Sequence, residues 1–78
     1  MIVRLFGPLR QCVGRGVLEV PEGLPHVGAL EAHLIAAHPA LAPHRPFWRV
    51  ALDKEYVSVE APLAGVCEAA LIPPVSGG

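Results

Sequence analysis

Only one stretch of the sequence has the periodicity of an amphipathic helix, and this limits the chain to folds in which one helix covers a sheet. Within residues 27–38 the apolar positions recur at spacings of three and four, on one helical face. They are Val27, Leu30, Leu34 and Ala37. Glu31 falls mostly off this face. Pro39 ends the helix, whereas Pro25 and His26 offer a poor N-cap, because Ser, Thr, Asp or Asn is expected there.

Strand-like segments lie on both sides of this helix. Residues 1–6 and 17–20 predict an antiparallel hairpin, with a Gly-Pro break and a wide loop over residues 9–16. Residues 40–46 predict a connection with a short 3₁₀ turn. Three further strands are expected, at residues 47–52, 56–59 and 68–72. The order β-β-α-β-β-β predicts an α+β roll in two layers.

The length and hydropathy of the chain indicate a small domain that acts by binding a larger partner. The 78 residues form one domain, which buries roughly 60–65% of its unfolded surface and has no room for a catalytic pocket of its own. Apolar residues make up 53% of the chain, so we expect an exposed apolar patch that binds a larger partner. The alternative is that Ala, Val and Pro raise this fraction without forming a patch.

Charge and hydropathy argue against several classes of partner. The net charge is −1 and the six basic residues are scattered, so we expect no nucleic-acid partner. No apolar run is long enough to span a membrane, and the first residues lack the layout of a secretion signal. Cys12 and Cys67 form no C-x-x-C pair, which suits a reducing compartment. We therefore expect a cytoplasmic location.

Histidine, cysteine and charged residues are further candidates for functional sites. His26 and His33 could share a helix face, but no histidine pair has i,i+4 spacing, so we expect no metal. Cys67 could act as a sulfur relay, although a reduced structural thiol is favoured. Residues 53–55, Asp-Lys-Glu, predict a solvated turn.

The last six residues form the most specific motif. They are Pro73, Pro74, Val75, Ser76, Gly77 and Gly78. This ending, directly after the apolar strand that closes with Leu71 and Ile72, resembles that of the molybdopterin synthase small subunits, which are ubiquitin-like sulfur carriers. The resemblance extends over residues 1–6, 20–23, 27–30, 38–39 and 50–57. Two departures are Val66-Cys67, where the family has Gly-Asp, and the missing Thr or Ser helix cap.

The resemblance implies a β-grasp fold over residues 1–72, with a mixed sheet of about five strands and one main helix on one face, and an extended tail over residues 73–78. It also implies that an ATP-dependent activating enzyme adenylates Gly78, and that a sulfur donor protein converts it to a thiocarboxylate. The tail then enters the large catalytic subunit, within a heterotetramer, and passes sulfur to a pterin precursor. The carrier itself binds no cofactor; its partner uses the ATP.

The residues of the tail suit such a cycle. Glycine has no side chain, so Gly77 and Gly78 form the thinnest peptide that can enter a partner's active site. Pro73 and Pro74 fix φ near −65°, so that the tail projects outward and loses less entropy on docking. Val75 and Ser76 extend it. The alternative is an unstructured end of chance composition.

The resemblance further implies that Phe6, Tyr56 and Ile72 contact the large subunit. For Phe6 the sequence agrees, because strand alternation places it with Arg4, opposite Val3. Tyr56 and Ile72 could equally be core residues.

Three other functions stay open at this stage. The chain could carry sulfur for thiamin, tRNA thiolation or cysteine synthesis. It could be a ubiquitin-like protein modifier, although Lys54 is the only lysine available for self-linked chains. It could also be an interaction domain that does not use its tail.

Overall fold

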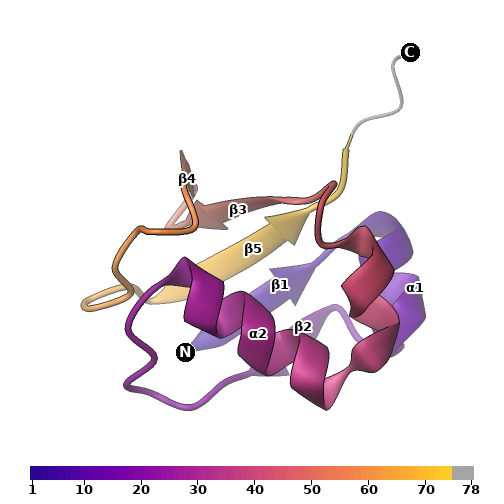
Figure 1. Ribbon diagram of the computed structural model, residues 1–78, viewed down its shortest axis with the longest axis horizontal. Helices are drawn as coiled ribbons and strands as arrows, with labels where there is room; N and C mark the ends of the chain where they lie inside the picture. The colour runs from indigo at the N-terminus through magenta and orange to yellow at the C-terminus, as the bar shows by residue number, and fades with distance from the viewer. Residues whose placement is uncertain (75–78) are drawn as a thin grey trace.

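The computed structural model describes residues 1–74 as a five-stranded sheet with helices packed on one face (Figure 1). The sheet order is β2-β1-β5-β3-β4, in which β1 and β5 are parallel and the other pairs antiparallel. The elements are β1 Ile2–Leu5, α1 Gly7–Val13, β2 Val17–Glu19, α2 Val27–Ala37, the 3₁₀ helix η1 Pro39–His44, β3 Arg49–Leu52, β4 Glu55–Val57 and β5 Glu68–Ile72. The predicted mixed β-grasp sheet is confirmed.

The expectation of a loop over residues 9–16 is wrong, because α1 occupies Gly7–Val13. The Gly-Pro pair, interpreted as a break, begins this helix instead: the fixed φ of Pro8 suits a first turn, where a missing N–H costs nothing. Gly14 ends it in the left-handed conformation, with its N–H bonded to the Arg10 carbonyl at 2.8 Å. The sequence signals that could have predicted α1 are Pro8 at its start and Gly14 after its end.

Helix α2 was placed correctly, but its buried face differs from the prediction. Val27, Leu30 and Leu34 are buried, whereas Ala37 is exposed and Glu31 is buried. The helix is therefore turned so that Glu31 faces the core, where it finds polar partners. The expected poor N-cap is also wrong, because the His26 Nδ1 atom accepts a hydrogen bond from the Ala29 N–H at 3.1 Å.

The strand predicted at residues 56–59 begins one residue earlier and is shorter. After β4, the chain turns to meet α2, and the Val59 carbonyl accepts from the Gly28 N–H at 2.9 Å. The strand predicted at residues 47–52 begins two residues later, so residues 47 and 48 lie outside β3. The predicted connection with a 3₁₀ turn is confirmed by η1.

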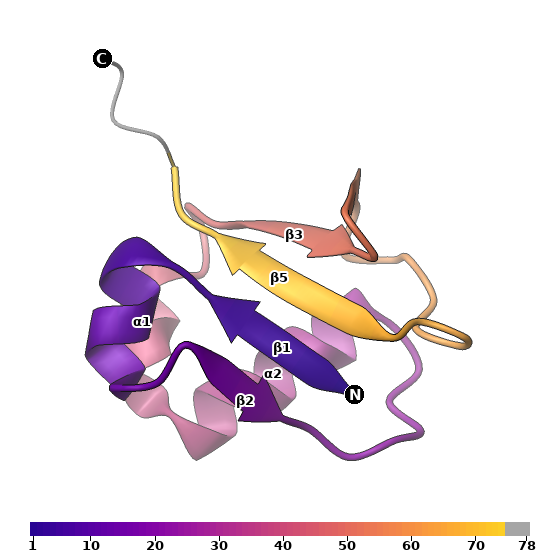
Figure 2. The same ribbon diagram turned by 180° about the vertical axis from the view of Figure 1, so that it is seen from behind.

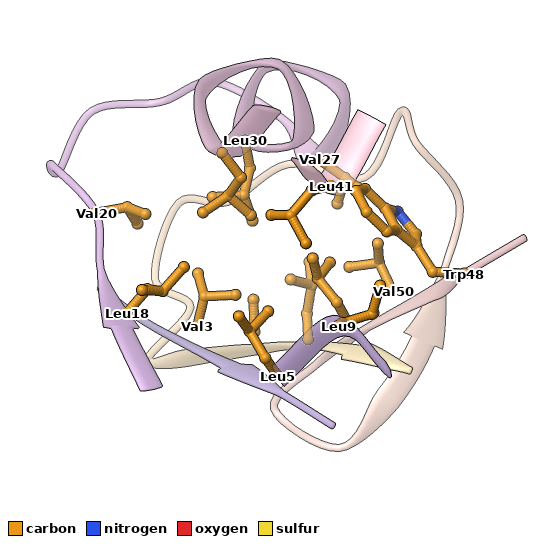
Figure 3. Close-up of a cluster of buried hydrophobic side chains, with 14 of the residues drawn as sticks. Val3, Leu5, Leu9, Leu18, Val20, Val27, Leu30, Leu41, Trp48 and Val50 are labelled. Carbon is orange, nitrogen blue, oxygen red and sulfur yellow. The ribbon is translucent and has the colours of Figure 1, made fainter. Parts of the chain in front are cut away.

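The core lies between the sheet and the helices (Figure 3). Its buried side chains are those of Val3, Leu5, Leu9, Leu18, Val20, Val27, Leu30, Leu34, Leu41, Trp48, Val50, Leu52, Leu63, Ala69 and Leu71. Burying each leucine contributes about 1.5–3 kcal/mol relative to leaving it exposed. Leu9 and Leu41 come from α1 and η1, so these short helices close one end of a core that α2 alone would leave open. Within residues 1–74, no helix has the length and apolar character needed to cross a bilayer.

Candidate functional site

The face of the sheet opposite the helices is open, and strand alternation decides which side chains it carries. Along β5, Ala69 and Leu71 point into the core, while Glu68, Ala70 and Ile72 are only partly buried. The open face is visible in Figure 2, where the sheet stands in front of α2.

A shallow hollow of about 310 Å³ lies on this open face. Its lining includes Ala70 and Ala51, which lie opposite each other on β5 and β3, and these side chains are smaller than those of the other lining residues. The lining residues are Arg4, Phe6, Ala51, Lys54, Tyr56, Glu68, Ala70 and Ile72. We call this the open-face hollow.

The structure brings all three sequence-predicted partner residues to this hollow. Phe6 is 46% exposed and Tyr56 is 55% exposed, so neither is a core residue, and Ile72 is half-buried at the end of β5. An exposed apolar cluster of this kind is typical of a protein interface. Contact with a large subunit stays a prediction for these residues.

Charged side chains lie at the edges of the open-face hollow. The Arg4 Nε atom forms a 2.9 Å salt bridge with Glu68 Oε1, across the parallel β1–β5 pair. The guanidinium of Arg49 lies 4.2 Å from the centre of the Tyr56 ring, which holds that ring in place through a cation–π contact. The apolar surface is therefore bordered by the cationic side chains of Arg4 and Arg49.

The base of the tail, residues 73 and 74, lies beside α1 and the segment around the end of η1. β5 leads directly from Ile72 into Pro73, which is half-buried, and Pro74, which is exposed. Gly7 has a φ of +53°, and a Cβ there would lie 3.4 Å from the Pro73 ring. Pro73 and Pro74 also border a small hollow of about 160 Å³, shared with Pro8, Leu9, His44, Phe47 and Trp48. The predicted tail residues Val75, Ser76, Gly77 and Gly78 lie outside the described residues.

The beginning of β5 is held by the turn over residues 53–55. The Asp53 carboxylate accepts hydrogen bonds from the backbone N–H groups of Cys67 and Glu68, at 3.2 and 3.0 Å. Asp53 and Lys54 have positive φ values of 47° and 74°, which suits the tight turn between β3 and β4. The turn predicted as merely solvated thus positions the strand that carries the tail.

Cys12 and His44 form a pair that sequence reasoning missed. Cys12 Sγ lies 3.3 Å from His44 Nε2, where α1 meets η1. The sequence gives no sign that Cys12 and His44 lie close together when residues 9–16 are interpreted as a loop. Cys67 is an exposed free thiol. Among residues 1–74, no group of three or more His, Cys, Asp or Glu side chains is arranged to hold a metal ion.

Comparison with protein families shows that residues 3–78 match the ThiS family. The chain belongs to the ThiS family. It is therefore a ubiquitin-like domain of the sulfur-carrier type. No curated protein sequence matches the chain significantly.

Solved structures of similar fold include two groups of ubiquitin-like proteins. SAMP1 of Haloferax volcanii has 31% identity and a TM-score of 0.83, covering 99% of this chain and 97% of its own. A molybdopterin converting factor subunit 1 from Pyrococcus furiosus, itself described as putative, has 24% identity and a TM-score of 0.77, with 95% of each chain covered. Subunit 1 in a complex with subunit 2 of that factor from Helicobacter pylori has 24% identity and a TM-score of 0.69, covering 99% and 96%. At 24% identity, the last two matches show the fold alone.

Proposed function

We propose that this chain is the sulfur-carrying small subunit of a molybdopterin synthase, with Gly78 as the site of sulfur attachment. The observation that carries the proposal is the sequence Pro73-Pro74-Val75-Ser76-Gly77-Gly78, placed directly after the last strand of a ThiS-family β-grasp domain. The strand β5 lies at the centre of the sheet, so the tail begins from a strand that is paired with a neighbour on each side.

The proposed chemistry proceeds in two steps at the Gly78 carboxylate. A free carboxylate is ionised at neutral pH and is a poor electrophile. Attack of its oxygen on the α-phosphorus of ATP, in the activating enzyme, releases pyrophosphate and gives an acyl-adenylate. Sulfide then attacks the carbonyl carbon and displaces AMP, which gives the thiocarboxylate directly. If the donor is a persulfide, its outer sulfur attacks and first forms an acyl disulfide, and a second thiol then breaks the S–S bond, which releases the thiocarboxylate and leaves a disulfide on the donor. The chain contributes an acyl group whose last two residues have no side chains.

The large catalytic subunit is the proposed acceptor partner. The open-face hollow lies beside the base of the tail, since Ile72 lines the hollow and Pro73 follows it. A partner that covers Phe6 and Tyr56 would therefore receive the tail at its edge. The complex of subunits 1 and 2 of the Helicobacter pylori factor supports a partner of this kind.

A second candidate is a protein modifier that forms isopeptide bonds. It is favoured by SAMP1, also described as small archaeal modifier protein 1, which at 31% has the highest identity of these relatives. Both functions begin with adenylation of Gly78, and they differ in the nucleophile that follows: a sulfur donor or the amine of a lysine.

The experiment that separates them is reconstitution with the large subunit. The chain is charged with an activating enzyme, ATP and a sulfur donor, then mixed with the large synthase subunit and the pterin precursor. Formation of the dithiolene product, with loss of the sulfur from Gly78, would support the synthase assignment. A chain that carries sulfur but yields no product with this partner would contradict it. Deletion of Gly78 is the matched control, because it leaves residues 1–74 unchanged.

A further inference from the structure

A thiol and an imidazole meet where α1 packs against η1, at one end of the molecule (Figure 1). Cys12 Sγ lies 3.3 Å from His44 Nε2, which is hydrogen-bond distance for a sulfur atom. Cys12 is exposed, and His44 is half-buried. The His44 carbonyl accepts hydrogen bonds from the N–H groups of Phe47 and Trp48, at 3.0 and 3.2 Å, so the backbone that carries the imidazole is held in place. The pair therefore combines an accessible nucleophile with a positioned proton acceptor.

The two stretches of chain that carry this pair are basic and contain no acidic residue. Residues 1–18 and 32–52 include no Asp or Glu, and Arg10 precedes Cys12 by two positions on α1. Among residues 1–74, Arg10 has no salt-bridge partner, so no carboxylate offsets its charge there. Basic surroundings stabilise a thiolate and attract anionic reagents.

The two carboxylates that border these stretches in the sequence lie elsewhere or are already bound. Glu19 lies opposite Ile2, at the beginning of β1, whereas α1 follows the end of that strand. Glu31 is 4% exposed, and its carboxylate is bound by Arg45 and Trp48. Neither of these carboxylates therefore offers a free negative charge to the Cys12 thiol.

The second thiol of the chain, Cys67, lies in different surroundings. It is also exposed and free, but the Asp53 carboxylate accepts a hydrogen bond from its N–H at 3.2 Å, and Glu68 follows it in the chain. Lys54 lines the same small hollow and is the only cation there. Among residues 1–74, no imidazole lies within hydrogen-bond distance of the Cys67 sulfur. Nearby carboxylates repel a thiolate and an anionic reagent, so the chain contains its own reference thiol.

We propose that Cys12 is the reactive thiol of this chain and a site of reversible exchange with small anionic disulfides, with His44 as the proton acceptor. In the tautomer that carries its proton on Nδ1, His44 takes the thiol proton at Nε2. The Cys12 thiolate attacks one sulfur of the reagent, the S–S bond breaks, and the other half leaves as a thiolate that takes the proton from His44. Cys12 is thereby oxidised to a mixed disulfide, and the departing half is reduced to a thiol. A second thiol reverses the exchange.

A group attached to Cys12 would lie near the base of the tail. His44 also lines the hollow of about 160 Å³ that Pro73 and Pro74 border. The Cys12 sulfur is therefore separated from this hollow by one side chain, that of His44. A modification here would change the surface next to residues 73 and 74 and leave the open-face hollow, on the other face of the sheet, uncovered. The reactivity of Cys12 does not depend on the proposed function.

Two single-thiol variants test the proposal: Cys67→Ser reports on Cys12, and Cys12→Ser reports on Cys67. Each is mixed with an excess of glutathione disulfide, which is anionic at neutral pH, and adduct formation is followed by intact mass spectrometry. Cys12 should react at least about tenfold faster than Cys67, because a thiol without a proton acceptor is mostly protonated at this pH. Cystamine, a cationic disulfide, should give a smaller ratio of the two rates, since basic surroundings repel it.

His44→Gln in the Cys67→Ser chain should slow the reaction of Cys12 at least about fivefold, because the proton acceptor is lost. His33→Gln is the matched control, since it removes a histidine of α2 that does not pair with Cys12, and it should leave the rate unchanged. In concentrated urea the difference between the two thiols should largely disappear, because the fold creates it.

Three results would overturn the proposal. The first is equal rates for Cys12 and Cys67 in the folded chain, and the second is a Cys12 rate that His44→Gln leaves unchanged. The third is a larger ratio of the two rates with cystamine than with glutathione disulfide, which would contradict the basic surroundings. Dispersed amide spectra of each variant establish that these rates belong to the folded chain.

Discussion

The indole N–H of Trp48 donates a 2.6 Å hydrogen bond to the carboxylate of Glu31, inside the core. Glu31 is 4% exposed and Trp48 is 7% exposed, and Arg45 adds a 3.3 Å salt bridge from the surface. A carboxylate is therefore buried in a small domain, with its partners supplied by the segment that follows η1. This arrangement joins α2 to the chain that leads into β3.

Replacing Glu31 by Ala should lower the free energy of unfolding by about 2 kcal/mol, because the buried indole N–H loses its acceptor. Glu31→Gln should cost less, since it keeps an acceptor oxygen of similar reach. Urea denaturation followed by Trp48 fluorescence measures both. Equal stability of the Ala variant and the parent would show that the hydrogen bond makes no net contribution.

His26 caps α2 through its ring, in place of a hydroxyl or carboxylate. Replacing it by Ala should lower the free energy of unfolding by about 1 kcal/mol, because the Ala29 N–H loses its acceptor. His26→Asp should be at least as stable as the parent, because a carboxylate accepts the same bond and interacts favourably with the helix dipole. Thermal unfolding of the three chains measures this order, and an Ala variant as stable as the parent would contradict it.

Asp53 combines a left-handed backbone with two accepted hydrogen bonds. Asp53→Ala should lower the free energy of unfolding by about 1–2 kcal/mol, through lost bonds and an unfavourable φ. Asp53→Asn should cost less, since Asn tolerates positive φ and keeps one acceptor. Hydrogen exchange at the Cys67 and Glu68 amides should rise in the Ala variant. Unchanged exchange there would mean that the carboxylate does not hold the beginning of β5.

A substitution of Phe6 tests whether the open-face hollow is the surface that binds the partner. Phe6→Arg should weaken binding to the large synthase subunit by about 2 kcal/mol, because a central apolar contact is replaced by a charge, while the fold stays intact. Val59→Arg is the control, since Val59 is an exposed apolar residue that does not line the open-face hollow. Calorimetry of the three chains measures the difference. Equal affinity for Phe6→Arg and the parent would exclude this surface.

Much of the fold could be predicted because alternation and helical periodicity are local signals. The five strands and α2 follow from them, as does the outward direction of Phe6. Helix α1 was missed because Gly7-Pro8 indicates both a break and a helix start, and only the packing of Leu9 against the core decides between them. The burial of Glu31 was missed for a related reason, since its partner Trp48 comes from a distant segment.

The candidate site could be predicted less completely. The resemblance gave Tyr56 and Ile72, but periodicity could not decide whether they were buried. Two lining residues of the open-face hollow, Ala51 and Ala70, lie opposite each other, and this register across β3 and β5 cannot be read from the sequence. The closeness of Gly7 to the Pro73 ring likewise depends on the parallel β1–β5 pairing, which brings together two ends of the chain.

The central claim is that Gly78 carries sulfur, and intact mass spectrometry tests it most directly. The chain is incubated with its activating enzyme, ATP and a sulfur donor, with the Gly78 deletion as the control. The account predicts a mass increase equal to one oxygen-to-sulfur exchange at Gly78, and no change in the deletion variant. An unmodified carboxylate, or a covalent adduct to a lysine in place of the exchange, would contradict it.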